Sequence, residues 1–84
     1  MIIAHNWNMS QDSILSNRII LANNVKKLRS RLKIRREELS LALGFDNSYI
    51  SKLEKGKINI TIDKLSVIAD YFVVDLVDLF KKSL

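Results

Sequence analysis

The sequence predicts an all-α fold, a compact bundle of five helices. Two observations lead to this prediction. The chain contains no Pro and only two Gly, so few residues interrupt a helix. Leu and Ile recur at spacings of three and four, which is the period of an amphipathic helix and not of a strand. With 84 residues, the chain has room for one domain built around one modest core.

The first helix is predicted to end near Lys33. Its inward face carries four apolar residues at spacings of four, three and four: Leu21, Val25, Leu28 and Leu32. The residues before it are compatible with a flexible arm, an extra helical turn or a strand. We therefore divide the chain into an N-terminal arm or extension over residues 1–17 and a domain over residues 18–84.

The second helix is expected over Arg36 to Leu43. Leu39 and Leu43 face inward, and two acidic residues occupy the first turn, where they complement the helix dipole. Gly44 follows as the left-handed residue that commonly ends a helix. A turn is therefore expected directly after this helix.

The third helix is expected over Asp46 to Lys55. Asp46 is a suitable N-cap, because its carboxylate can accept a hydrogen bond from a free backbone N–H near the start of the helix. Ile50 and Leu53 face inward, and the helix stops at Gly56. The remaining side chains of this helix project away from the core.

Two further helices complete the bundle. Thr61 is the expected N-cap of the fourth helix, and Asp75 is that of a short fifth one. The inward stripe of the fourth helix comprises Ile62, Leu65, Ile68, Ala69 and Phe72. The fifth helix carries Leu76, Leu79 and Phe80.

The second and third helices, joined across residues 44–46, have the pattern of a helix-turn-helix. In this unit the second helix of the pair projects outward and enters the major groove of DNA. The small Ser40 fits a place where the two helices cross closely. The exposed face of the third helix offers donors and acceptors suited to base edges. The expected base contacts are Asn47, Ser48, Tyr49 and Lys52.

Positive charge is concentrated in one part of the chain. The formal net charge is +5, and residues 18–57 contain eleven Lys and Arg against four Asp and Glu. Residues 58–84 contain three against four. The densest basic stretch, from Lys26 to Arg36, contains no acid. This distribution suits a polyanion such as nucleic acid, although a solvated basic helix face is the alternative interpretation.

The stretch from Leu21 to Phe80 resembles the lambda-repressor/Cro-like (Xre-type) helix-turn-helix family. The resemblance is carried by Leu28-Arg29, Glu37-Glu38-Leu39, Leu41-Ala42-Leu43-Gly44, Tyr49-Ile50-Ser51, Leu53-Glu54-Lys55-Gly56, Asn59, Leu76 and Leu79-Phe80. It implies a five-helix bundle, binding to double-stranded DNA as a homodimer and a role in transcription regulation. It also implies an ion pair between Arg29 and Glu54 that fixes the third helix to the scaffold. A phosphate contact is the alternative role for Arg29.

Contacts to the DNA backbone are expected beside the third helix. Free N–H groups at the start of the second helix favour anions, and the loop after the third helix adds polar side chains. The expected phosphate contacts are Arg35, Arg36, Ser51, Lys57 and Asn59. The chain departs from the family at Arg35 and Arg36, which stand where a Ser or Thr cap and a Gln are usual. The cap is thereby lost, and the operator sequence of a relative does not transfer. Solvation of both arginines without a DNA contact is the alternative interpretation.

The C-terminal segment has more apolar residues than one short helix can bury against its own core. Related small regulators dimerise through this end, so the resemblance implies a dimer interface that includes Val74, Val77 and Phe80. Two-fold symmetry then sets the two recognition helices one DNA turn apart, roughly 34 Å. Closure of the monomer's own core is the alternative for these residues.

Composition argues against several other classes of protein. The chain has no Cys and a single His, His5, so no disulfide, metal site or cofactor is expected. No apolar run is long enough for a membrane span and the start does not resemble a signal peptide, so we expect a cytoplasmic protein that does not bind a membrane. No catalytic constellation or Gly-rich phosphate loop is visible, so neither an enzyme nor a small-molecule ligand is expected.

The sequence therefore predicts a sequence-specific DNA-binding transcriptional regulator that binds a pseudo-palindromic operator as a homodimer. As a single domain, it is more similar to the controller proteins of restriction-modification systems, or to phage Cro-type repressors, than to a ligand-responsive repressor. The competing interpretation is an antitoxin or adaptor, in which the same fold is a protein-interaction module.

Overall fold

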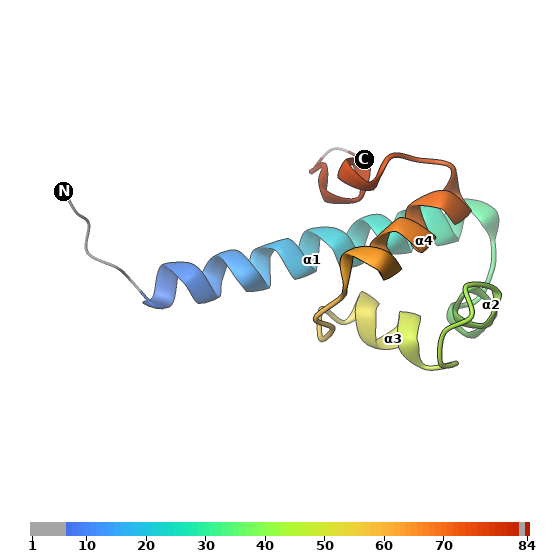
Figure 1. The fold of residues 1–84 in the computed structure, drawn as a ribbon, viewed down its shortest axis with the longest axis horizontal. Helices are drawn as coiled ribbons and strands as arrows, with labels where there is room; N and C mark the ends of the chain where they lie inside the picture. Colours follow the sequence, from blue (N-terminus) through green and yellow to red (C-terminus); the bar gives the residue numbers. More distant parts are fainter. Residues whose placement is uncertain (1–6, 83) are drawn as a thin grey trace.

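The computed structural model describes residues 7–82 and 84, which form four α-helices and one 3₁₀ helix (Figure 1). In chain order these are α1 (Trp7–Leu32), α2 (Arg36–Ala42), α3 (Tyr49–Glu54), α4 (Ile62–Phe72) and η1 (Leu76–Phe80). No strand occurs in this part of the chain, so the predicted all-α class is confirmed. The prediction of five α-helices is wrong by one, because the fifth element is a 3₁₀ helix of five residues. The 3₁₀ helix is tighter than an α-helix and occurs in short pieces.

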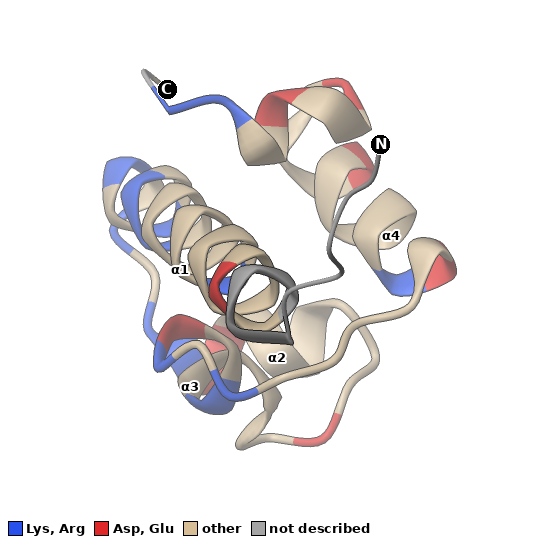
Figure 2. Ribbon diagram, turned by 90° about the vertical axis from the view of Figure 1, so that its left-hand side faces the viewer, with Lys and Arg blue, Asp and Glu red and all other residues tan. Residues whose placement is uncertain are grey.

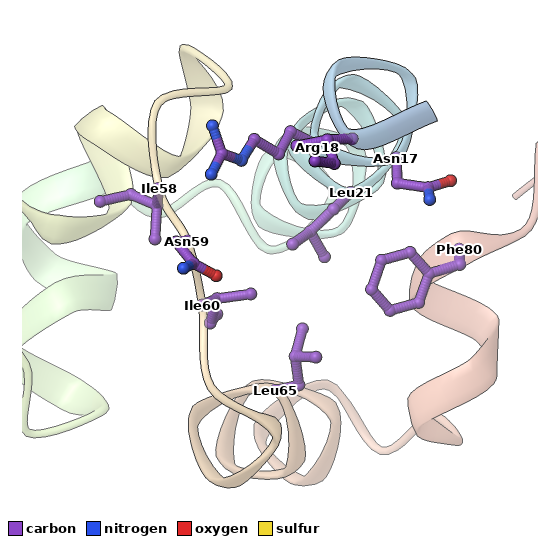
Figure 3. Close-up of a pocket in the computed structure, with 9 residues that line it drawn as sticks. Asn17, Arg18, Leu21, Ile58, Asn59, Ile60, Leu65 and Phe80 are labelled. Carbon is purple, nitrogen blue, oxygen red and sulfur yellow. The ribbon is translucent and has the colours of Figure 1, made fainter. Parts of the chain in front are cut away.

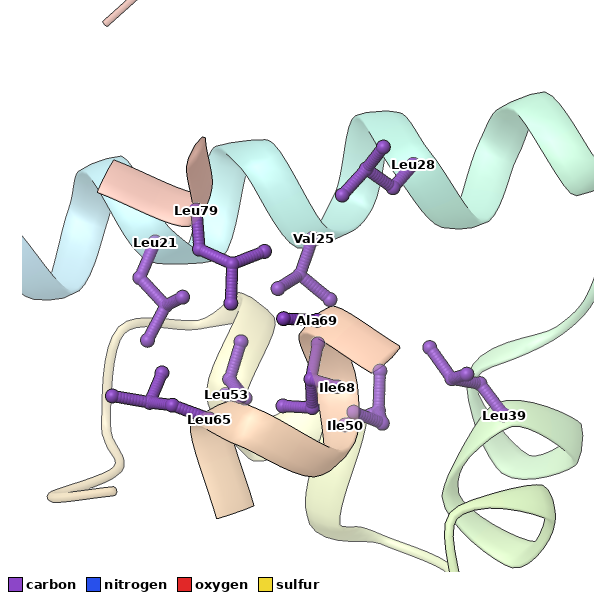
Figure 4. Close-up of a cluster of buried hydrophobic side chains, with 10 residues drawn as sticks. All are labelled: Leu21, Val25, Leu28, Leu39, Ile50, Leu53, Leu65, Ile68, Ala69 and Leu79. Atoms are coloured by element: carbon purple, nitrogen blue, oxygen red, sulfur yellow. The ribbon is translucent and has the colours of Figure 1, made fainter. Parts of the chain in front are cut away.

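One hydrophobic core joins all five elements (Figure 4). In Figure 1, α1 runs across the molecule, with η1 above it, α4 overlapping it, and α2 and α3 below it. The buried apolar side chains are Leu21, Val25 and Leu28 of α1, Leu39 of α2, Ile50 and Leu53 of α3, Leu65, Ile68 and Ala69 of α4, and Leu79 of η1. Most of these positions were predicted from the helical spacing, which confirms the inward faces of the predicted helices.

Helix α1 begins well before the predicted domain. Residues 7–17 continue this helix, which selects the helical alternative among the three considered for the N-terminal stretch. Residues 1–6, which include His5, lie outside the described part of the chain. In Figure 1 the N-terminal part of α1 extends past the rest of the bundle. On α1, Ile14, Leu15 and Ile19 are each about half exposed, at 51%, 52% and 54%.

A buried amide holds η1 against α1. Asn24 is 2% exposed, and its Nδ2 donates to the carbonyl oxygens of Leu79 and Lys81, each at 2.8 Å. A buried amide without such partners would lose its hydrogen bonds to water at a cost of a few kcal/mol, roughly 1–3 in proteins. The C-terminal segment is therefore positioned by a polar contact as well as by the burial of Leu79.

Two residues predicted to face inward are exposed. Leu32 is 52% exposed and Ile62 is 71% exposed. Each is a terminal residue of its helix, Leu32 the last of α1 and Ile62 the first of α4. At the start of α4 the Cα–Cβ bond points back toward the helix N-terminus, so the side chain of Ile62 projects beyond the packed part of the helix. At Leu32, α1 ends and the chain turns away, one turn beyond buried Leu28.

The predicted caps of the last two helices have different outcomes. The hydroxyl of Thr61 accepts a hydrogen bond from the N–H of Lys64 at 3.2 Å, so this cap is confirmed. Asp75 occupies the N-cap position of η1, but its side chain makes no capping hydrogen bond. Instead the carboxylate of Asp78 accepts from the N–H of Asp75 at 3.1 Å. This bond is the reciprocal half of a capping box, in which a first-turn side chain accepts the N–H of the N-cap residue.

Helix α4 ends in a left-handed residue that is not a glycine. Val73 has φ 57° and ψ 47°, and the N–H groups of Val73 and Val74 donate to the carbonyls of Asp70 and Ala69. These two bonds form a Schellman motif, which usually has Gly at this position. For a residue with a β-carbon the left-handed conformation costs roughly 1–2 kcal/mol, and a β-branched residue is a particular outlier. Val73 recovers little by burial, because it is 89% exposed.

Replacing Val73 with Gly should therefore raise the free energy of unfolding, by about 1 kcal/mol once the greater chain entropy of Gly is subtracted. Val67 provides a matched control, since it is an exposed Val inside α4. Val67→Gly should lower the free energy of unfolding by about 1 kcal/mol. Urea denaturation followed by circular dichroism measures both, and changes of the same sign would contradict the strain at Val73.

Candidate nucleic-acid interface

The chain turns sharply between α2 and α3 at Gly44. This residue has φ +77°, a conformation that is strained for residues with a β-carbon. Its N–H donates to the carbonyl of Leu41 at 3.0 Å, and the N–H of Phe45 donates to that of Ser40 at 2.9 Å. This is again a Schellman motif, and it confirms Gly44 as the predicted end of the second helix.

Helix α3 starts three residues later than predicted. It runs from Tyr49 to Glu54, and Ser48 occupies the N-cap position instead of Asp46. The carboxylate of Asp46 accepts from the hydroxyl of Ser48 at 2.5 Å and from its N–H at 3.2 Å. These hydrogen bonds lower the pKa of Asp46, the hydroxyl more than the N–H. Because Ser48 itself precedes the first helical residue, its N–H is not a free donor of the first turn, and the Asp46 carboxylate closes an Asx-type turn and does not cap the helix.

Ser40 connects the two helices through a buried hydroxyl. The side chain is 0% exposed, and its Oγ donates to the carbonyl of Arg36 at 2.9 Å. The same oxygen accepts from the N–H of Ile50 at 3.0 Å, in the first turn of α3. This N–H has no partner within its own helix, so Ser40 supplies the partner from α2. The sequence predicted a small residue here but missed this hydrogen bond.

The inward anchors of α3 are the predicted ones. Ile50 is 0% exposed and Leu53 is 2% exposed. Burial of these two side chains turns the opposite side of the helix outward. Of the residues expected to contact bases, Asn47 and Lys52 are exposed, and Ser48 is half-buried.

Tyr49, the fourth expected base contact, is partly built into the scaffold. Its ring lies 4.8 Å from that of Phe45, measured between centroids, and Lys64 Nζ lies 4.5 Å from the Tyr49 centroid. Burial raises the pKa of the Tyr49 phenol. The ring therefore lies between Lys64 of α4 and Phe45 of the turn, which the sequence did not predict. A cation over an aromatic face is stabilising by about 0.5–1 kcal/mol at such exposed sites.

The carboxylate of Glu54 binds two arginines. Its side chain is 4% exposed, and it accepts from Arg29 Nε at 2.7 Å and from Arg29 Nη2 at 3.2 Å. This two-pronged pair is the one that the family resemblance implies. Arg36 Nε donates to the same carboxylate at 2.9 Å, and the Arg36 side chain is 48% exposed. Arg36 was expected to contact phosphate, and its bond to Glu54 was not anticipated.

The other expected phosphate contacts surround α3. Ser51 is half-buried, and Lys57 and Asn59 are exposed in the loop that follows the helix. Arg35 is exposed and pairs with Glu38 at 3.1 Å. The Glu38 carboxylate also accepts the backbone N–H of Arg35, which is the half of a capping box that does not need a Ser or Thr at position 35. These bonds lower the pKa of Glu38, the backbone bond more than the side-chain bond.

Comparison with known families decides the class of this arrangement. A family model described as helix-turn-helix matches residues 25–79, which span the end of α1 through most of η1. The chain belongs to the Xre/lambda-repressor-like helix-turn-helix family. This membership places it among DNA-binding regulators, in which the second helix of the helix-turn-helix is the recognition helix.

Two solved structures have the same fold. A hypothetical transcription factor, NHTF from Neisseria, is 28% identical with a TM-score of 0.74, over 77% of this chain and 75% of that one. The restriction-modification controller protein C.AhdI from Aeromonas hydrophila is 21% identical with a TM-score of 0.71, over 79% of this chain and 96% of that one. No curated protein matches the sequence.

Charge is unevenly distributed over the helix-turn-helix domain. Figure 2 shows Lys and Arg gathered along α1 and α3, and Asp along α4 and η1.

No helix of the described part of the chain is long and apolar enough to cross a membrane. Within residues 7–82 and 84, no three His, Cys, Asp or Glu lie close enough together to hold a metal ion.

A hollow between α1, the loop before α4, and η1 is mainly apolar. Figure 3 shows Leu21, Leu65 and Phe80 pointing into it, with Asn17 and Arg18 on α1 beside them. Of the residues expected in a dimer interface, Val77 is 64% exposed, whereas Val74 and Phe80 are partly buried against the core. The alternative that these residues close the monomer's own core therefore applies in part to Val74 and Phe80.

Replacing Ser40 with Ala should lower the free energy of unfolding by about 1–3 kcal/mol, because the N–H of Ile50 loses its buried acceptor. Ser66→Ala is the matched control, since the exposed Ser66 hydroxyl donates to a carbonyl four residues back, like that of Ser40, but accepts nothing from another helix. The control should change stability little. Equal losses in a denaturant titration would refute the role of Ser40 as a link between α2 and α3.

Replacing Glu54 with Gln should lower the free energy of unfolding by about 3 kcal/mol. The change leaves the nearly buried charge of Arg29 without its counter-ion. Glu38→Gln removes a carboxylate from the exposed Arg35 pair, and there only a small loss is expected. Thermal or chemical unfolding of the two variants provides the comparison. A Glu54 variant as stable as the Glu38 variant would rule out a structural role for the buried pair.

Proposed function

We propose that this chain is a sequence-specific transcriptional regulator that binds a pseudo-palindromic operator as a homodimer, with α3 in the major groove. The observation that carries the proposal is the way α3 is held. Ile50, Leu53 and Glu54 fix one side of the helix to the scaffold, which leaves polar side chains on the other side. This side lies within the basic part of the chain, which favours a nucleic acid as the partner.

Direct base contacts are proposed for the outward residues of α3 and of the turn before it: Asn47, Ser48, Tyr49 and Lys52. An amide such as that of Asn47 can bond an adenine through both of its polar atoms, and a Lys such as Lys52 can donate to guanine. Phosphate contacts that set the register are proposed for Arg35, Arg36, Ser51, Lys57 and Asn59.

The division of the chain into residues 1–17 and 18–84 remains a proposal, and its boundary falls inside α1.

The homodimer is proposed through the C-terminal face, with Val74, Val77 and Phe80 as interface residues. Exposed Val77 supports this assignment, and so does the apolar hollow that Phe80 lines. A controller role, as in restriction-modification systems, is favoured by the likeness to C.AhdI, which is a likeness of fold. We assign the chain a binding role and not a catalytic one.

A protein-interaction module is the second candidate. The half-exposed apolar side chains of Ile14, Leu15 and Ile19 on α1 favour it, because exposed apolar surface can mark a protein contact. An antitoxin or adaptor would use this surface in place of, or together with, the basic one.

Selection of bound fragments from random DNA tests the proposed function. A pseudo-palindromic consensus is expected if two copies bind with two-fold symmetry. On the selected site, Asn47→Ala and Lys52→Ala should each cost about 1–3 kcal/mol of binding free energy, and much less on random DNA. Lys57→Ala should weaken binding to both alike.

Titrations of the wild type and the three variants on both duplexes separate the outcomes. Equal small losses on specific and random DNA for all three variants would contradict the assignment of α3 as the reading helix. A consensus without internal symmetry, together with a monomer in sedimentation at micromolar concentration, would contradict the homodimer.

A further inference from the structure

A second hollow of the molecule is lined by charged and polar groups from three helices. Its lining comprises Lys26 of α1, Arg36 of α2, Ser51 and Glu54 of α3, and Lys55, which follows α3 directly. Residues 26 and 36 are ten positions apart in sequence, and 51–55 lie further along, so the fold alone brings these groups together. Lys26 and Lys55 have no role in the contacts proposed above.

The positive charges that line the hollow outnumber its negative charges. It is lined by three cations and one anion, and the anion, Glu54, also pairs with Arg29 behind it. Among the described residues, neither Lys26 nor Lys55 forms an ion pair with a carboxylate. An uncompensated group of cations in one hollow favours the binding of an anion.

The groups also have the chemistry to bind one phosphate. Arg36 uses Nε for Glu54, which is one of the five N–H donors of a guanidinium, and the remaining donors suit phosphate oxygens. The lysines add point charges, and Ser51 adds a neutral hydroxyl donor. The bond to Glu54 holds Arg36 in place before an anion arrives, so less side-chain freedom is lost on binding.

The hollow lies next to the base-facing side of α3. Ser51 and Lys55 are four residues apart and therefore neighbours on one face of the helix, and exposed Lys52 lies beside Ser51 in sequence. A phosphate bound there belongs to a strand that borders the groove occupied by α3. We propose that this hollow binds one phosphate of the DNA backbone and that Lys26 makes α1 part of the DNA interface. The inference rests on the proposed function.

A matched pair of variants on α1 tests it. Lys26→Gln and Lys27→Gln remove the same charge from neighbouring exposed positions. Both lysines line another hollow, together with Asn23, Ser30 and Arg31, but only Lys26 also lines the hollow beside Arg36 and Lys55. The affinity for one duplex is measured over a range of salt concentrations. Lys26→Gln should flatten the slope of log K against log salt by about 0.9, the effect of one phosphate contact, and Lys27→Gln by much less.

A second measurement locates the phosphate. In the selected duplex, single phosphates are replaced one at a time by uncharged methylphosphonate. At one position the replacement should abolish the losses caused by both Lys26→Gln and Lys55→Gln, because the shared partner is already gone. Losses that add to the effect of methylphosphonate at every position, or equal slopes for Lys26→Gln and Lys27→Gln, would overturn the proposal and leave DNA binding intact. A wild-type protein that binds no duplex would overturn the proposed function as well.

Discussion

The DNA-facing arrangement depends on the buried carboxylate of Glu54. At 4% exposure this group is stable only when its charge is paired and its oxygens are hydrogen-bonded, and Arg29 of α1 supplies both. The pair ties the last residue of α3 to the longest helix of the molecule. Ile50 and Leu53 fix the same helix by burial. Because its last residue and its inner side are both fixed, the polar side chains of α3 can face only away from the core.

The sequence predicted the buried faces of the helices because burial repeats with the helical period. Leu21, Val25 and Leu28 follow that period, and all three are buried. The same pattern failed at Leu32 and Ile62, since periodicity gives the direction of a side chain and not the place where its neighbours stop. The α3 anchors were likewise predicted by spacing, whereas the Arg29 pair came from the family resemblance alone.

The sequence did not predict the polar contacts between helices. The hydroxyl of Ser40 meets the N–H of Ile50, and the amide of Asn24 meets two carbonyls near the C-terminus. Both partners are backbone groups, which every residue carries, so no residue type in the sequence marks them. Asp46 was misplaced for a related reason. Its carboxylate can cap a helix or close a turn with equal local chemistry, and the packing of α3 decides between them.

Arg36 places a positive charge at the start of α2. Where the resembled family usually has a Gln, this chain has a cation that the carboxylate of Glu54 holds in place. Because Arg29 already balances the charge of Glu54, the charge of Arg36 is left to act outward, toward any anion near α3. A held cation strengthens binding to the backbone of every DNA sequence alike, since phosphates carry no sequence information. In the proposed complex, discrimination among sequences must therefore come from α3 and the turn before it. Asn47 and Lys52 are the main candidates, because the Tyr49 ring is already in contact with Phe45 and Lys64.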